Sequence, residues 1–167
     1  NALDLNNGQA GTGGKYAELP NNAALDTVQE GNYTISAWFY PYSVPADTSP
    51  TSNDRNWAIV LKYGQHTGLV YDKDQHFVMR HYLTGNVLET ATGTTTHGVN
   101  NWYHVVGVVD KDAGTVKIYV NGTLEATQSF TAGTAAREYG TAHWRIGKAL
   151  STWAADGRVD QVRIYSR

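Results

Sequence analysis

The sequence contains no cysteine, which excludes zinc–thiolate sites, disulfide bonds and cysteine nucleophiles. Charged side chains make up only 17% of its 167 residues, and the formal net charge is -2. This balance gives no electrostatic basis for binding DNA, RNA or an anionic lipid surface. No apolar run approaches the length needed to cross a bilayer. We therefore expect neither a nucleic-acid partner nor a membrane partner.

Short segments with β-strand patterning recur along the chain, separated by turn residues. In segment 34–40, Ile35, Ala37 and Phe39 alternate with polar or aromatic neighbours. Asn121–Gly122 between two alternating segments is a strong hairpin signal, because both residues tolerate positive φ. About ten to twelve strands at roughly 8–12-residue spacing predict an all-β sandwich or barrel. The best candidates for short helices are segments such as 21–26 and 134–140.

Five strings occur in an informative order: "ALDLNNG", "GNYTISAWFYPYS", "NNWYHVVGVVDKDAGTVKIYVNG", "WRIGKA" and "DGRVDQVRIYSR". Their order resembles that of the concanavalin A-like, laminin G-type jelly-roll family. The resemblance covers nearly the whole chain, with a loose match over residues 43–100. It implies a two-sheet antiparallel β-sandwich, a jelly roll whose first and last strands are neighbours, as a single domain over residues 1–167. Composition alone does not select this topology over other sandwiches.

Glucanases and polysaccharide lyases share this fold, so the fold does not decide activity. A glycosidase of this kind needs paired carboxylates on one strand, and no glutamate here has such a neighbour. A lyase in this fold typically places tyrosine and histidine on one sheet. His81 and Tyr82 are adjacent and must point to opposite faces, whereas Arg80 and Tyr82 share a face. We therefore expect a noncatalytic protein, with a small polysaccharide lyase as the weakest alternative.

Carbohydrate sites use aromatic rings and planar polar groups, and the five tryptophans and eleven tyrosines supply candidates. Trp38, Trp102 and Tyr119 occupy strand positions similar to the family's, and we expect them to be structural, as we do Trp144. His104 is expected to be a hydrogen-bonded structural histidine. Loop aromatic residues have less reason to be buried. The loop candidates for ligand binding are Trp153 and Tyr139.

A second group of candidates combines positive charge with aromatic rings. If these side chains gather on the concave sheet or its rim, they suit an acidic or sulfated glycan through charge-assisted hydrogen bonds. The alternative is an ordinary solvated sheet face. The candidates are Arg80, Tyr82, Lys62, Tyr63, His66, Tyr71 and, in a loop, Arg137.

Similar jelly rolls commonly hold a calcium ion that ties the first strand to the last. The matching positions are Asp4 and Asp160, to which Asn7 or Gly8 can add oxygens. Simple alternation puts Asp160 on the apolar face of Val162 and Ile164, where a charge must be paired or metal-bound. A salt bridge to an arginine or an exposed edge position is the alternative. "DKD" at 72–74 resembles a calcium-loop fragment but is better explained as a polar hairpin turn.

These features predict a noncatalytic carbohydrate-binding module, extracellular or at the cell surface, that is monomeric and binds a polysaccharide or oligosaccharide. The chain starts at Asn1, and we expect it to be excised from a longer secreted enzyme or adhesin. There it would tether a catalytic domain to its polymer and raise the effective concentration. An extracellular protein-interaction or adhesion domain is the alternative.

Overall fold

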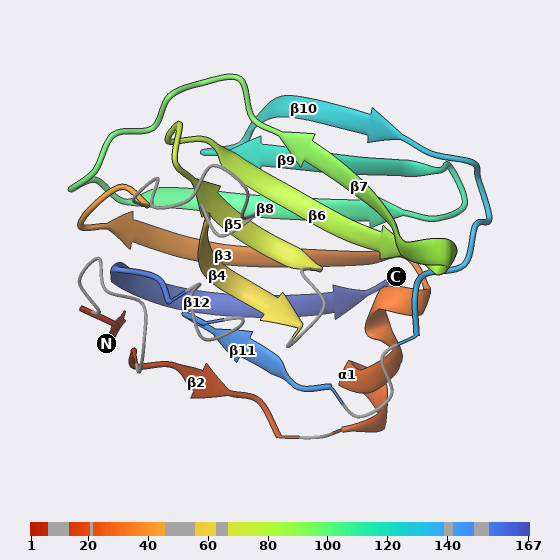
Figure 1. Ribbon diagram of the computed structural model, residues 1–167, viewed down its shortest axis with the longest axis horizontal. Coiled ribbons are helices and arrows are strands. Elements are labelled where there is room, and N and C mark those ends of the chain that lie inside the picture. The colour runs from red at the N-terminus through yellow and green to blue at the C-terminus, as the bar shows by residue number, and fades with distance from the viewer. Residues whose placement is uncertain (7–13, 21, 46–55, 63–66, 139–141, 149–153) are drawn as a thin grey trace.

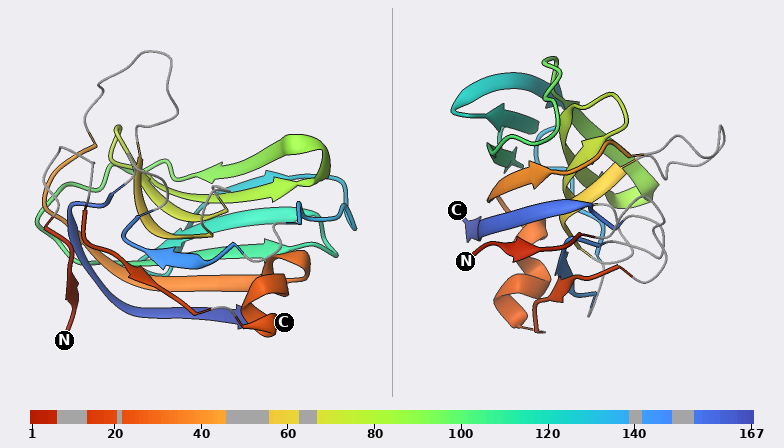
Figure 2. Two further views of the ribbon diagram at one scale, coloured as in Figure 1. Left: turned by 60° about the horizontal axis from the view of Figure 1, so that its bottom comes forward. Right: turned by 90° about the vertical axis from the view of Figure 1, so that its left-hand side faces the viewer.

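A computed structural model describes residues 1–6, 14–20, 22–45, 56–62, 67–138, 142–148 and 154–167. These residues form two antiparallel sheets stacked face to face (Figures 1 and 2), which confirms the predicted two-sheet sandwich. Sheet A consists, in spatial order, of β1 (Leu3–Asp4), β12 (Gly157–Ser166), β3 (Tyr33–Pro41), β8 (Tyr103–Asp110), β9 (Thr115–Val120) and β10 (Thr123–Ser129). Sheet B consists of β2 (Ala17–Glu18), β11 (Trp144–Ile146), β4 (Asn56–Lys62), β5 (Gly68–Asp72), β6 (Phe77–Leu83) and β7 (Val87–Thr92).

Short helical pieces connect the strands. The helix α1 (Ala23–Thr27) is capped by Asn22, whose side chain accepts a hydrogen bond from the Ala24 amide, and it continues into η1 (Val28–Glu30). A further turn, η2 (Thr84–Asn86), joins β6 to β7. No described helix is long and apolar enough to span a membrane.

The second candidate helix was wrong. In residues 134–138, the described part of that segment, Ala136 forms an isolated antiparallel bridge with Leu83. The amide of Arg137 donates to the Tyr82 carbonyl, so the backbone bonds to β6 and not to itself. The edge strand β7 was not predicted from the sequence; its first residue, Val87, is exposed.

Local turn chemistry explains the hairpins. Asn121 and Gly122 have φ values of 50° and 82°, and they join β9 to β10 as predicted. Inside the sandwich, Phe39 from sheet A meets Tyr71 and Phe77 from sheet B, with ring centroids 5.9 and 6.3 Å away. These rings are fully buried and hold the two sheets together through apolar contact.

The first and last strands are neighbours in sheet A, as expected. β12 pairs with β1 on one side and with β3 on the other. Asp160 and Arg163 are three positions apart on β12, but their partners on β3, Trp38 and Ser36, are only two positions apart. Gln161, in between, has a φ of 48°. This is a β-bulge, and it changes which side chains face the core.

The bulge corrects the expected position of Asp160. Val162 and Ile164 pack against the core, but Asp160 lies opposite Trp38 on the outer face of sheet A. The partial exposure of Asp160 removes the need for a buried partner. Simple alternation failed here because it assumes an unbroken period of two.

The buried His81 makes stability depend on pH. Burial, helped by the positive charge of Lys111, lowers the pKa of His81 to about 4, and its Nδ1 lies 3.0 Å from the Tyr33 hydroxyl. In the unfolded chain the group protonates near its usual pKa of about 6.5. Its contribution is therefore complete above about pH 6.5 and is lost as the pH falls toward 4, an effect of about 3 kcal/mol.

We expect denaturant titrations of the parent protein to show this extra loss between pH 7 and pH 4. A His81→Gln variant retains a polar partner for Tyr33 but cannot titrate, so its free energy of unfolding should fall less over the same range. Equal pH dependence in the two proteins would contradict the assignment.

Candidate functional site

The outer face of sheet A carries the side chains that its strands do not bury. On β3, Ile35, Ala37 and Phe39 are fully buried, so Trp38 and Tyr40 point outward. The register places His104 of β8 opposite Trp38. The strand pattern that builds the core therefore also brings aromatic groups together on the surface.

A hollow of about 650 Å³ lies on this outer face. Val106 and Val108 alternate with the buried residues of β8 and present apolar side chains to the hollow, and Tyr119 and Lys117 face it from β9. Tyr165, which is 49% exposed, approaches from β12. We call the full set of lining residues the sheet A hollow: Thr34, His104, Val106, Val108, Asp110, Lys117, Tyr119, Gly122, Tyr165, Ser166 and Arg167.

His104 is held in a defined position at one end of the hollow. Its Nε2 lies 3.0 Å from the Ser36 hydroxyl, and its ring lies against Trp38 with centroids 5.1 Å apart and an interplanar angle of 31°. The main-chain amide of His104 donates to the Asn121 side chain. Rings fixed beside hydrogen-bonding groups suit a ligand that has both apolar faces and hydroxyl groups.

Positive charge borders the hollow. Lys117 and Arg167 line it, and Arg163 lies on the outer side of β12 opposite Ser36. The two nearby acids have local partners: Asp110 accepts from the Ala113 amide, and Asp160 accepts from the Gln161 amide. This border could form charge-assisted hydrogen bonds with carboxylate or sulfate groups.

The predicted patch on the other sheet is only partly formed. Arg80 and Tyr82 share the outer face of sheet B, as expected, and the Arg137 guanidinium lies 5.9 Å from the centre of the Tyr82 ring. However, Arg80 is only 7% exposed, and burial lowers its pKa. A ligand would therefore reach Tyr82 and Arg137 more readily than Arg80.

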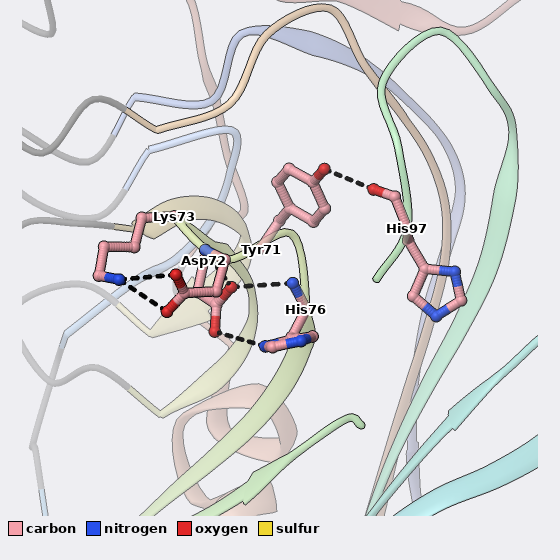
Figure 3. Close-up of polar contacts among 6 residues, drawn as sticks. Tyr71, Asp72, Lys73, His76 and His97 are labelled. Carbon is pink, nitrogen blue, oxygen red and sulfur yellow. Dashed lines mark hydrogen bonds and ion pairs between the residues drawn. The ribbon is translucent and has the colours of Figure 1, made fainter. Parts of the chain in front are cut away.

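Two members of that predicted patch are buried, and their assignment to a ligand surface was wrong. The Tyr71 side chain points into the core, where its hydroxyl donates to the His97 carbonyl over 2.6 Å (Figure 3). Lys62 is fully buried, and its ammonium group donates to the Asp26 carbonyl and, over 3.0 Å, to the Gln29 side chain. Burial lowers the pKa of Lys62. Both side chains hold the fold together from within.

Four further candidates, Trp153, Tyr139, Tyr63 and His66, lie outside the described residues. Their roles stay predictions.

The chain matches the model of the concanavalin A-like lectin/glucanases superfamily over residues 11–167. The chain belongs to this superfamily. No curated protein sequence matches it.

Several solved structures have a fold similar to that of this chain. A Bacteroides ovatus protein provisionally named as carbohydrate-binding is 17% identical with a TM-score of 0.65, over 90% of this chain and 40% of that one. The CBM40 of a Ruminococcus gnavus sialidase, bound to α2,3-sialyllactose, is 16% identical with a TM-score of 0.61, and the match covers 90% of this chain and 89% of that one. Domain 4 of the extracellular arabinanase AbnA from Geobacillus stearothermophilus, bound to arabinotriose, is 17% identical with a TM-score of 0.54, and the match covers 93% of this chain and 68% of that one.

These likenesses show a shared fold. The chain spans less than half the length of the Bacteroides protein, 40% of it.

The metal ligands implied by the family resemblance are only partly described. Asp4 lies on the outer face of sheet A beside Arg158, whose Nε is 3.5 Å from its carboxylate, and it accepts from Tyr42 over 3.1 Å. Asp160 lies two residues farther along β12. Within the described ranges, no three His, Cys, Asp or Glu side chains group closely enough to hold a metal ion. The other proposed ligands, Asn7 and Gly8, lie outside those ranges.

The "DKD" segment forms a turn, as the sequence favoured. The Asp72 carboxylate accepts from the amides of Asp74 and His76 over 2.9 and 2.8 Å, and it lies 3.6 Å from the His76 ring (Figure 3). Lys73 pairs with Asp74 over 2.7 Å. The carboxylates therefore close the β5–β6 hairpin.

The sheet A hollow was not predicted, because Tyr119 and His104, which line it, and Trp38 and Trp102, on the same face beside it, were expected to be structural. Trp144 is indeed buried and donates to the Leu25 carbonyl, but Trp38 and Tyr119 are partly exposed and Trp102 is 39% exposed. Alternation along 34–40 had already separated Trp38 from the core residues. That signal was sufficient to place it on the outer face.

Proposed function

We propose that this chain is a noncatalytic carbohydrate-binding module and that the sheet A hollow holds its glycan. The observation that carries the proposal is the exposed combination of Tyr119, Tyr165 and His104 around an apolar floor. The aromatic side chains offer flat surfaces to sugar rings, and the polar groups can bond to hydroxyls. The glycan-bound structures with the same fold support this reading.

The separation of His81 from Tyr82 favours binding over lyase chemistry. His81 is buried and bonded to Tyr33, whereas Tyr82 faces outward from the same strand. The two side chains therefore cannot act together on one substrate. We further propose that the module is monomeric, is secreted or displayed at the cell surface, and tethers an attached enzyme to its polymer.

Truncating Tyr119 to alanine should weaken glycan binding about tenfold or more, because buried aromatic anchors dominate such interfaces. Tyr82→Ala, on the opposite sheet, is the matched control and should bind like the parent. A glycan array followed by calorimetry on the best ligand measures both, with unfolding midpoints to confirm that each variant folds.

The opposite result, loss in Tyr82→Ala alone, would move the site to the predicted patch with Arg80 and Arg137. Absence of binding to any glycan, together with tight binding to a protein, would replace the proposal with an adhesion domain. Release of unsaturated sugars from a polymer would replace it with a lyase.

An acidic or sulfated glycan suits the border of Lys117, Arg163 and Arg167. We expect Arg163→Gln to weaken binding to such a glycan about two- to fivefold, the size of an exposed charge pair, and to reduce its salt dependence. Binding to a neutral glycan of equal length should not change. Lys73→Gln removes the same charge from sheet B and serves as the control; an equal loss in both variants would contradict a local role for Arg163.

Calcium between the first and last strands is part of the same proposal, with Asp4, Asn7, Gly8 and Asp160 as ligands. Two described carboxylates are available, although Arg158 already neutralises part of the charge on Asp4. A bound ion would provide positive charge that fixes β1 against β12 and would not enter any chemical step.

If calcium binds, a saturating concentration should raise the unfolding free energy by up to about 3 kcal/mol through mass action. Asp160→Asn should remove this gain, whereas Asp74→Asn, in the hairpin turn, should keep it. Thermal unfolding with calcium and with chelator measures the effect. An unchanged midpoint in the parent protein would exclude the calcium site without affecting the glycan proposal.

A further inference from the structure

The aromatic surface continues beyond the sheet A hollow. Tyr40 lies against Trp102 with ring centroids 5.4 Å apart, and Tyr42 follows at 5.7 Å from Tyr40. Trp38, which contacts His104 at the end of the hollow, precedes Tyr40 by two residues on β3. We call Trp38, Tyr40, Tyr42 and Trp102 the aromatic track.

The hollow and the track follow one strand. Thr34 lines the hollow, and Thr34, Ser36, Trp38 and Tyr40 are successive outward positions of β3. At about 3.4 Å per residue, Thr34 and Tyr40 are about 20 Å apart. The described surface is therefore much longer than a single sugar needs.

Packing does not explain why the track is aromatic. Tyr40, Tyr42 and Trp38 are partly exposed, and Trp102 is among the most exposed large apolar side chains described, at 39%. Ring contacts hold these side chains in place, and the Arg158 guanidinium lies 5.5 Å from the Tyr42 ring and 5.9 Å from the Tyr40 ring. Exposed rings of fixed orientation beside the hollow indicate a continuous contact surface.

Charge runs beside the rings. The outward positions of β12 next to β3 are Arg158 opposite Tyr40, Asp160 opposite Trp38 and Arg163 opposite Ser36, and Arg167 follows at the hollow. Arginines thus occur at both ends of the surface and between them; they outnumber the two acids on the same face, Asp4, which pairs with Arg158, and Asp160, which accepts from the Gln161 amide. This distribution complements a ligand whose negative charge repeats along its length.

We propose that the sheet A hollow and the aromatic track together bind an internal stretch of a linear acidic polysaccharide, with the chain lying along β3. This inference rests on the proposed function and narrows it, because a site for a terminal sugar would use the hollow alone. One group of sugars occupies the hollow at Tyr119, and later sugars contact Tyr40 and Trp102. Arg158 and Arg163 face the acidic groups of the chain.

Calorimetry with size-graded oligosaccharides tests the inference. The probes are oligogalacturonides, heparin-derived oligosaccharides and neutral arabino-oligosaccharides, each from disaccharide to octasaccharide. In an acidic series, affinity should rise with length and level off once the chain reaches from Tyr119 to Trp102. Trp102→Ala should remove the gain of the longer chains, about tenfold, and leave the shortest bound oligosaccharide unaffected.

Two further variants make the outcomes distinguishable. Tyr40→Ser interrupts the same track without changing Trp102, so it covers the case in which Trp102→Ala fails to fold. Tyr16→Ala removes an exposed tyrosine next to β2 of sheet B and should behave like the parent.

Equal affinity for short and long chains would overturn the extended site, and so would Trp102→Ala and Tyr40→Ser variants that bind the longer chains as tightly as the parent does. Either result would leave the proposed glycan site in the hollow intact. A preference for the neutral series would overturn the acidic substrate. Failure of every series to bind would overturn the proposed function itself.

Discussion

Strand alternation against a shared core is the constraint on which the rest of this structure depends. The sheet A strands β3, β8 and β9 give every second side chain to the space between the sheets, where Phe39, Val105 and Ile118 are fully buried. Because the sheet is pleated, the intervening side chains must lie on its outer face. The surface that we assign to a glycan is therefore positioned by the same residues that stabilise the fold, and it needs no separate scaffold.

The two sheets use their outer faces differently. On sheet B, Ala58, Leu61, Val70 and Val78 form a second apolar cluster and are at most 4% exposed, although they lie outside the main core. On sheet A, the outer face keeps Trp102 and Tyr165 open to solvent. The outer face of sheet B is therefore shielded from solvent at this cluster, whereas the outer face of sheet A, where we propose the glycan site, is more open.

Local signals made much of the fold predictable, because strand periods and turns such as Asn121–Gly122 act over a few residues. The candidate site was harder to predict. Lys62 and Tyr71 look like surface residues in the sequence. In the structure, Lys62 is buried against α1 and η1, and Tyr71 is buried against the loop at His97. Both contacts join residues that are far apart along the chain, so the sequence could not reveal them. The edge strand β7 and the bulge at Gln161 also depend on neighbours that no short window contains.

The β-bulge in β12 has a consequence for how related chains can differ. It shifts the phase of the strand by one residue, so that Asp160 and Arg163, three positions apart, emerge on the same side. Deleting Gln161 would leave Val162 alone opposite Ala37 and restore an unbroken alternation, with Asp160 and Arg163 still outward and Val162 and Ile164 still inward. Related chains can therefore lose one residue at this point without turning a core side chain outward, whereas a one-residue deletion elsewhere in the strand would turn over the part that follows it.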